Sequence, residues 1–269
     1  MRKVIPLLIF LILAVSAVAA TQDSAKLTQI IDRVLAIDRA QNEFIKDITF
    51  DVVSYEKSVG SDGKVKETKK YLKRVYMKRL EGGKYGYHED YLDYYIDGVR
   101  QDSKDLDKMA QEKAEKKKKR GGKDIAFDMF APLKPENSSL YIVTYEEISP
   151  KAVDGVTCYL VRAAADSTSA PEGVLDTLVN CLYYIDTASY HIVLAEFAPA
   201  KLVSKFMFKM STLDMSINYE PYSDSLWLPY RFHIRGKAKA MYFMGINFEG
   251  EEDYTNPVIN ADISDSLFQ

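Results

Sequence analysis

The sequence has few of the residues on which most catalytic and metal sites depend. Among 269 residues there are only two cysteines and three histidines. None of His88, His191 and His233 stands at metal-ligand spacing from another histidine or from a cysteine. The chain also lacks a Gly-x-Ser-x-Gly elbow, a phosphate-binding glycine loop and a His-Glu-x-x-His helix. We therefore expect no metal, no cofactor and no enzymatic activity.

One polar triplet, His88-Glu89-Asp90, could in principle supply acid and base groups. It stands in a tyrosine-rich segment that has the pattern of a strand, and we expect it to form a solvated edge. No catalytic residue is predicted, and a hydrolytic enzyme remains only as an alternative.

The N-terminus has the pattern of a secretory signal peptide. Arg2 and Lys3 precede the apolar run Val4 to Val15, and Ala17-Val18-Ala19 supplies the small residues of a cleavage site. The run is shorter than the ~20 apolar residues that span a bilayer. We expect cleavage before Ala20 and a periplasmic protein. No cysteine directly follows the cut, so it is not itself expected to be a lipoprotein.

Composition is that of an ordinary globular protein, with 47% hydrophobic and 28% charged residues. The sequence predicts a signal peptide at 1–19 and a single domain at 20–269. The formal net charge is -3, and it becomes more negative when the two basic residues of the leader are removed. This acidic balance argues against nucleic acid as a partner.

The two cysteines, Cys158 and Cys181, fall in neighbouring predicted strands. A turn centred near Thr168 to Pro171 would place them directly opposite each other, with Cα atoms roughly 4.5 to 5.5 Å apart. A disulfide in that position would persist after export. The alternative is a pair of buried free thiols that act as small apolar residues. The sequence leaves both open.

Apolar periodicity predicts one amphipathic helix followed by many strands. In the helix, Ser24 to Asp47, apolar residues recur at spacings of three, four and seven. Alternation, tyrosines and β-branched residues mark the strands, and prolines fall between them. The chain is therefore predicted to be mainly β, of the α+β kind. The predicted strands are Ile48–Lys57, Val65–Leu80, Tyr85–Ile96, Ile125–Phe130, Leu140–Ser149, Thr157–Ala163, Leu178–Ile185, Tyr190–Phe197, Leu202–Tyr219, Leu226–Arg235 and Ala240–Tyr254.

Two segments are strongly basic. The strand Val65 to Leu80 is expected to present its lysines and arginines on the solvated face of an outer strand; the alternative is a strand that binds phosphate or an anionic surface. Asp102 to Arg120 predicts an exposed, charged helix, inserted at about 102–122. Its basic end, Lys116 to Arg120, could contact an anionic membrane surface or a membrane protein; the alternative is a plain insertion between strands.

The last third of the chain has the most apolar material. Phe206, Phe208 and Met210 alternate, and a β-bulge near Ser211 would explain why the alternation resumes out of phase. Several strands are apolar on both faces, which fits either a two-layer core or a pocket for an apolar ligand. The candidate cavity residues are Phe206, Phe208, Met210, Met215, Trp227, Phe232, Met241 and Phe243.

Four short motifs occur in order: SLYIVTYEE, VDGVTCYLVRA, LYYIDTASYHIVLAEF and DSLWLPYRFHI. Their key parts lie at Tyr141 to Glu147, Asp154 to Val161, Ile185 to Tyr190 and Trp227 to Pro229. In this order of parts the chain resembles the LolA/LolB-like outer-membrane lipoprotein-sorting superfamily.

The resemblance implies a curved antiparallel half-barrel sheet with helices on its concave side. The cavity between them would hold acyl chains of a lipoprotein or another lipid, and the protein would act as a carrier, as in outer-membrane lipoprotein sorting. Burial of each chain methylene is worth roughly 0.8 kcal/mol. The alternative is an envelope interaction or scaffold module of the same fold whose cavity is filled by its own side chains.

Overall fold

The computed structural model describes residues 5–60, 63–80, 85–119, 128–146, 152–171, 174–202, 204–205, 208–240 and 244–268. The side chains of 5–23 and of a few further positions within these ranges lie outside the description.

In the described residues, twelve strands form a single sheet, and every pairing in it is antiparallel. The predicted class, mainly β with few helices, is confirmed. The strands are β1 (Asp47–Val59), β2 (Val65–Arg79), β3 (Tyr85–Ile96), β4 (Val99–Arg100), β5 (Tyr141–Glu146), β6 (Cys158–Ala165), β7 (Val179–Asp186), β8 (Ile192–Pro199), β9 (Ser204–Lys205), β10 (Phe208–Ser223), β11 (Leu226–Ala240) and β12 (Met244–Ile259).

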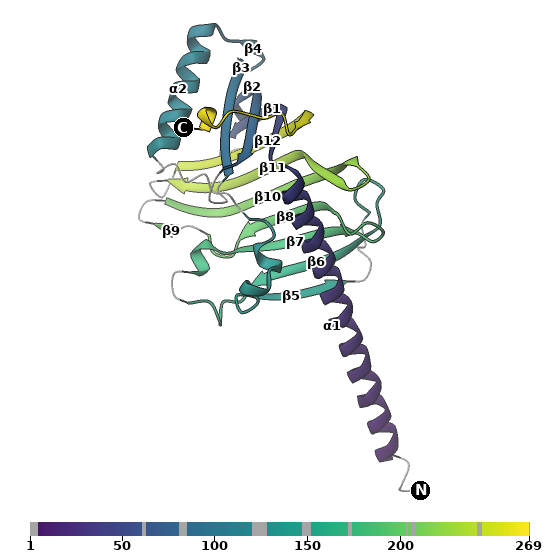
Figure 1. Ribbon diagram of the computed structural model, residues 1–269. Coiled ribbons are helices and arrows are strands. Elements are labelled where there is room, and N and C mark those ends of the chain that lie inside the picture. Colours follow the sequence, from purple (N-terminus) through teal and green to yellow (C-terminus); the bar gives the residue numbers. More distant parts are fainter. Residues whose placement is uncertain are drawn as a thin grey trace.

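The strand order is β4-β3-β2-β1-β12-β11-β10-β8-β7-β6-β5, with β9 paired to β10. The chain thus runs outward from β1 to one edge, crosses to β5 at the other edge, and returns strand by strand. The first and the last long strand meet in the middle, where Ile48 pairs with Ile259 and Val59 with Asn247. The sheet is strongly twisted and curved, as Figure 1 shows.

Two helices accompany the sheet. The helix α1 (Ile5–Phe44) lies across β5 to β11 in Figure 1, and its first half projects beyond the sheet. Ile30 and Val34, one turn apart, are fully buried against the sheet, which confirms the predicted amphipathic helix after Ser24. The helix begins earlier than predicted, because it continues from 5–23. Among the described residues, no helix is both long and apolar enough to cross a membrane.

The second helix, α2 (Ser103–Lys119), follows the short strand β4 and confirms the predicted helical insertion. Asp102 caps it, since its Oδ1 accepts a hydrogen bond of 3.0 Å from the Asp105 amide. Short 3-10 helices complete the fold: η2 (Ala131–Leu133), η3 (Pro135–Asn137), η4 (Leu175–Thr177) and η5 (Asp265–Phe268). The side chains of Lys116 to Arg120 lie outside the described residues.

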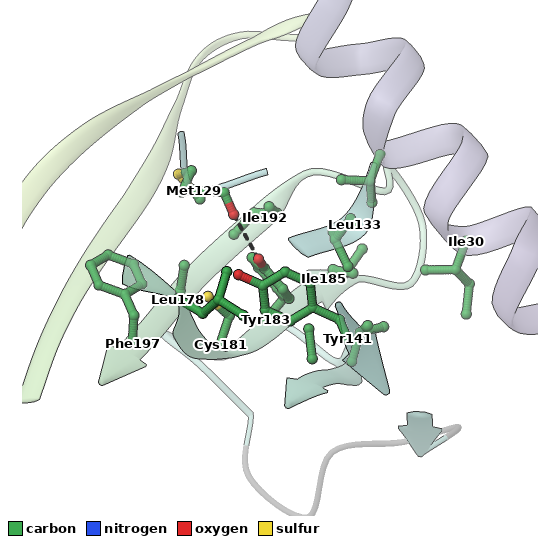
Figure 2. Packing of buried hydrophobic residues seen from close by; sticks show 14 residues of the cluster. Ile30, Met129, Leu133, Tyr141, Leu178, Cys181, Tyr183, Ile185, Ile192 and Phe197 are labelled. Carbon is green, nitrogen blue, oxygen red and sulfur yellow. Dashed lines mark hydrogen bonds between the residues drawn. The ribbon is translucent and has the colours of Figure 1, made fainter. Parts of the chain in front are cut away.

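The main core lies between α1 and the strands β5 to β8 (Figure 2). Tyr183 is its largest fully buried ring, and its hydroxyl donates a 2.6 Å hydrogen bond to the carbonyl oxygen of Met129. This bond ties the segment before η2 to the centre of β7. It also satisfies a polar group that burial would otherwise leave unpaired.

Two local predictions have different outcomes. The bulge near Ser211 is confirmed, because the register of β10 against β11 shifts between Met210 and Thr212. The predicted strand at 125–130 is wrong where it can be checked. Residues 125–127 lie outside the description, and Met129–Phe130 form a turn that leads into η2.

The predicted register of the two cysteines is wrong. Cys158 lies opposite Asp186, and Cys181 lies opposite Ala163. Because Cys158 and Ala163 are separated by an odd number of steps along β6, the two cysteines lie on opposite faces of the sheet. Both thiols are free and buried, so the bridge is not formed. The connection between β6 and β7 includes η4, and the pairing is centred further along the chain than the predicted turn, which shifts the register.

Burial raises the pKa of both thiols to about 11. We therefore expect neither cysteine to react with a maleimide at pH 8 in the folded protein, and both to react after unfolding in denaturant. Mass spectrometry of the labelled chain would check this. Labelling of one thiol at the rate of a free peptide would contradict the burial of that residue.

Candidate functional site

An apolar strip runs along the concave face of the sheet, beyond the part that α1 covers. Strand registers place its members on one face: Ile217 lies opposite Phe232, Met215 opposite Ile234, and Leu213 and Phe248 both lie opposite Gly236. None of these apolar side chains is fully buried. We call this set the concave strip, and it consists of Leu213, Met215, Ile217, Phe232, Ile234, Ile246 and Phe248.

Two glycines leave space for side chains of the concave strip to lie flat against the sheet. A Cβ atom at Gly236 would lie 2.3 Å from the ring of Phe248, and one at Gly250 would lie 2.9 Å from Cγ2 of Ile234. Phe248 and Ile234 can therefore lie down over the neighbouring strand, because no side chain occupies that space. The result is a flat apolar surface with open room above it.

A groove of about 340 Å³ lies over this floor. Ile234, Phe248 and Gly250 form its base, and charged side chains of β1, β2 and β12 form its rim, among them Glu56 and Lys69. A second cavity of about 300 Å³ lies between α2 and the sheet, and Glu56 and Lys69 line it as well. The two cavities thus share a wall. No histidine or cysteine belongs to the described lining of either one.

Apart from Trp227, the predicted cavity residues fall into three groups. Met215 and Phe232 belong to the concave strip, where they pack at the border of the main core. Met210 is half-buried opposite Ala238, two positions beyond Gly236 on β11. The remaining candidates on these strands cannot be placed: Phe206, Met241 and Phe243 lie outside the described residues, as does the side chain of Phe208.

Trp227 occupies a different place from the other candidates. Its ring stacks on His191 at 5.2 Å between centroids, and together they line a cavity of only about 30 Å³ under α1. Gln41 of α1 accepts a 2.8 Å hydrogen bond from the Trp227 amide. Trp227 therefore anchors the C-terminal part of α1 and does not line the open groove.

The imidazole ring of His191, beside Trp227, is buried. The side chain is 6% exposed, and neither ring nitrogen has a partner. Burial lowers the pKa of His191 below its usual 6.5, while the nearby Ser225 main chain and Asp186 oppose this only in part. The folded protein thus binds a proton on this ring only at a lower pH than the unfolded chain, which binds one below about pH 6.5.

Stability should therefore fall as the pH drops below 6.5, by up to about 1.4 kcal/mol per pH unit from this group. The variant His191→Phe keeps a flat ring against Trp227 and has no titrating group. We expect its free energy of unfolding to change less than that of the wild type between pH 7 and pH 5.5, in urea denaturation. Parallel curves for the two proteins would contradict this role of His191.

A buried charge network adjoins the concave strip. Lys73 on β2 is 5% exposed, and its Nζ donates to Glu89 Oε1 at 2.5 Å and to Glu252 Oε1 at 2.6 Å. Glu252 lies directly opposite Phe232 of the strip. Three tyrosine hydroxyls donate to the two carboxylates at 2.6 to 2.8 Å; they belong to Tyr87, Tyr91 and Tyr254.

The network fixes the protonation states of its members. Burial alone would lower the pKa of Lys73, but Glu252 and Glu89 outweigh it, and the pKa is raised. For Glu89, burial is likewise outweighed by Lys73 and by the tyrosine hydroxyls, and the pKa is lowered. At neutral pH the lysine and the carboxylate are both charged.

The sequence-based reading of these residues was wrong. β2 is not an outer strand, because it lies between β1 and β3, and Lys73 points into the protein. Within the triplet, His88 and Asp90 pair on a partly exposed face at 2.8 Å, while Glu89 turns inward to Lys73. The alternation of β2 itself, Tyr71-x-Lys73-x-Val75, is the signal that could have placed Lys73 on the inner face.

A larger cavity, of about 560 Å³, shares only Met215 with the concave strip. It is lined mainly by side chains that alternate to the opposite face of the sheet, among them Arg162, Glu196, His233 and Arg235. Its lining mixes charged side chains with apolar ones, and the charged ones suit water better than a hydrocarbon chain. Among the described residues, no cluster of three or more His, Cys, Asp or Glu side chains could hold a metal ion.

The fold and the site define a class of protein: a curved open sheet whose concave face carries an apolar strip between two helices. No protein family matches the chain by its sequence, and no curated protein does so.

Two solved structures have a related arrangement. A DUF1329 family protein from Desulfovibrio piger ATCC 29098 is 12% identical, with 90% of this chain and 97% of that one covered and a TM-score of 0.45. A domain named for outer membrane lipoprotein sorting, from Vibrio parahaemolyticus, is 11% identical, with 89% and 97% covered and a TM-score of 0.42. At these identities and TM-scores, neither likeness assigns the chain to a family or gives it a function.

Proposed function

We propose that this protein is a non-enzymatic carrier that holds acyl chains of a lipid or lipoprotein on its concave face. The observation that carries the proposal is the concave strip, an apolar surface left open between α1 and α2. Its groove of about 340 Å³ is large enough for part of a chain. Each methylene that enters it gains roughly 0.8 kcal/mol.

The cellular setting comes from the sequence. The N-terminal pattern predicts export to the periplasm, and the motif resemblance points to outer-membrane lipoprotein sorting. The basic run Lys116 to Arg120 would supply a contact with an anionic membrane surface or a membrane protein.

A scaffold or interaction module is the second candidate, and one observation favours it. The part of the concavity under α1 is already filled, because Ile30 and Val34 pack there against Val161, Tyr183 and Ile185. Among the described residues, the open part of the concave face is the region between α1 and α2. If that region closed as well, no ligand could enter, and the partner would have to bind on an outer surface.

Native mass spectrometry of the protein purified from its own envelope separates the two candidates. The carrier should retain a lipid or acylated peptide, and after delipidation it should take up a fluorescent fatty acid. A chain that carries no lipid and binds no fatty acid would reject the carrier and leave the scaffold module.

A further inference from the structure

The helix α2 rests on the sheet above a cavity and not above a packed core. None of its described side chains is fully buried, and Leu106, Met109, Ala110 and Lys113 form its half-buried face. The cavity of about 300 Å³ below it is lined by Met109 and Lys113 of this face, by charged side chains of the helix, and by Glu56, Tyr71 and Tyr94 of the sheet. The contact between α2 and the sheet is thus partly polar.

Lys113 makes an unusual set of contacts there. Its Nζ lies 3.0 Å from Glu56 Oε1 and 3.9 Å from the centre of the Tyr71 ring. The ring of Tyr91 lies 5.4 Å away. Tyr71 is held in place by its own hydroxyl, which donates to Glu56 Oε2 at 3.1 Å, and by parallel stacking on Tyr94 at 5.1 Å.

An ammonium group between aromatic faces and a carboxylate is the arrangement by which proteins recognise alkylammonium ligands. Here the ammonium belongs to the protein itself. We propose that Glu56, Tyr71 and Tyr91 form a binding site for the ammonium headgroup of an amphiphile, and that Lys113 occupies this site until such a ligand displaces it.

The position of the site relative to the groove supports this inference, which rests on the proposed function. Glu56 lines both the cavity under α2 and the groove over Ile234 and Phe248. An acyl or alkyl chain on the concave strip would therefore carry its headgroup to Glu56. Exchange of one ammonium for another leaves the carboxylate paired, so the site is not left with an unpaired charge during the exchange. Displacement of Lys113 would break the ion pair that joins α2 to Glu56 of β1.

The test uses two ligands with the same chain and opposite headgroups, decylammonium and decanoate, measured by titration calorimetry below their micelle concentrations. Lys113→Gln removes the internal competitor, and we expect it to bind decylammonium about tenfold more tightly than the wild type does. Lys104→Gln removes the same charge from an exposed position of α2 and should leave the affinity unchanged. Glu56→Gln should bind decylammonium about tenfold more weakly, with no loss for decanoate.

Hydrogen exchange gives an independent readout. Saturation with decylammonium should speed the exchange of α2 amides in the wild type, because the Lys113 ion pair is lost, whereas decanoate should not.

The possible failures can be distinguished. If both ligands bind but Lys113→Gln changes neither affinity, the proposed headgroup site is rejected, whereas the proposed carrier function is retained. If neither ligand binds to the wild type or to any of the variants, both the carrier function and the headgroup site are rejected. Unchanged exchange of α2 under saturating decylammonium would overturn the displacement of Lys113.

Discussion

Replacement of Lys73 by methionine is expected to destabilise the protein by about 3–5 kcal/mol, the cost of removing one partner from a buried ion pair. Methionine fits the space of the lysine stem, so the loss comes from charge. Without the ammonium, Glu89 and Glu252 face each other with side chains only 22% and 21% exposed. Urea denaturation at pH 7 measures the effect, and Lys66→Met, at an exposed position of the same strand, should change stability by less than about 0.5 kcal/mol.

Two further measurements separate charge from packing in this prediction. The wild-type network loses stability in acid, because the lowered pKa of Glu89 gives stabilisation that disappears as that carboxylate is protonated. In Lys73→Met the carboxylates repel, so the deficit relative to the wild type should shrink as the pH falls from 7 to 5. The triple variant with Glu89→Gln and Glu252→Gln should regain most of the lost stability. If the triple variant is as unstable as the single one, packing and not charge is responsible.

The introduction of a carboxylate into the concave strip should abolish most acyl-chain binding. In Ile234→Asp, a bound chain loses apolar contact with about three methylenes, or about 2 kcal/mol, which corresponds to a roughly thirtyfold weaker affinity for a fluorescent fatty acid. Ile234 is suited to this test, because it lies over Gly250 at the base of the groove.

The matched control for this variant is Thr212→Asp. Thr212 is exposed, and its side chain lies on the opposite face of the sheet from that of Leu213. The substitution therefore adds the same charge away from the concave strip. Circular dichroism should show both variants folded, and only Ile234→Asp should lose fatty-acid binding. Equal binding by both variants would mean that the chain lies elsewhere.

Local patterns in the sequence were sufficient to predict most of the helices and strands. The spacing of Ile30 and Val34 predicted α1, and the phase change at Ser211 predicted the bulge in β10. Both features depend on residues that are near each other in the chain, where periodicity of 3.6 or 2 records burial directly.

Non-local features could not be predicted in the same way. The burial of Lys73 depends on Glu252, which is 179 residues away along the chain. The alternation of β2 could place Lys73 on the inner face, but it could not show which carboxylates would meet the ammonium there. The cysteine register was wrong for a related reason: the conformation of the connection before Cys181, which includes η4, sets where the pairing is centred, and the turn residues alone did not show that conformation. Ile234 and Phe248 belonged to recognised strands, but only the glycines on adjacent strands show why they form an open floor.

The meeting of β1 and β12 in the middle of the sheet affects how the chain can fold. Asp51 and Thr255, which join these strands through a hydrogen bond, are 204 residues apart. Nearly the whole chain must therefore be synthesised before the two halves of the sheet can unite, and closing so long a loop makes folding slow. Until β12 is in place, β1 and β11 are long unpaired edges that could pair with other chains. A protein built in this way would benefit from crossing a membrane unfolded and folding only once it is complete.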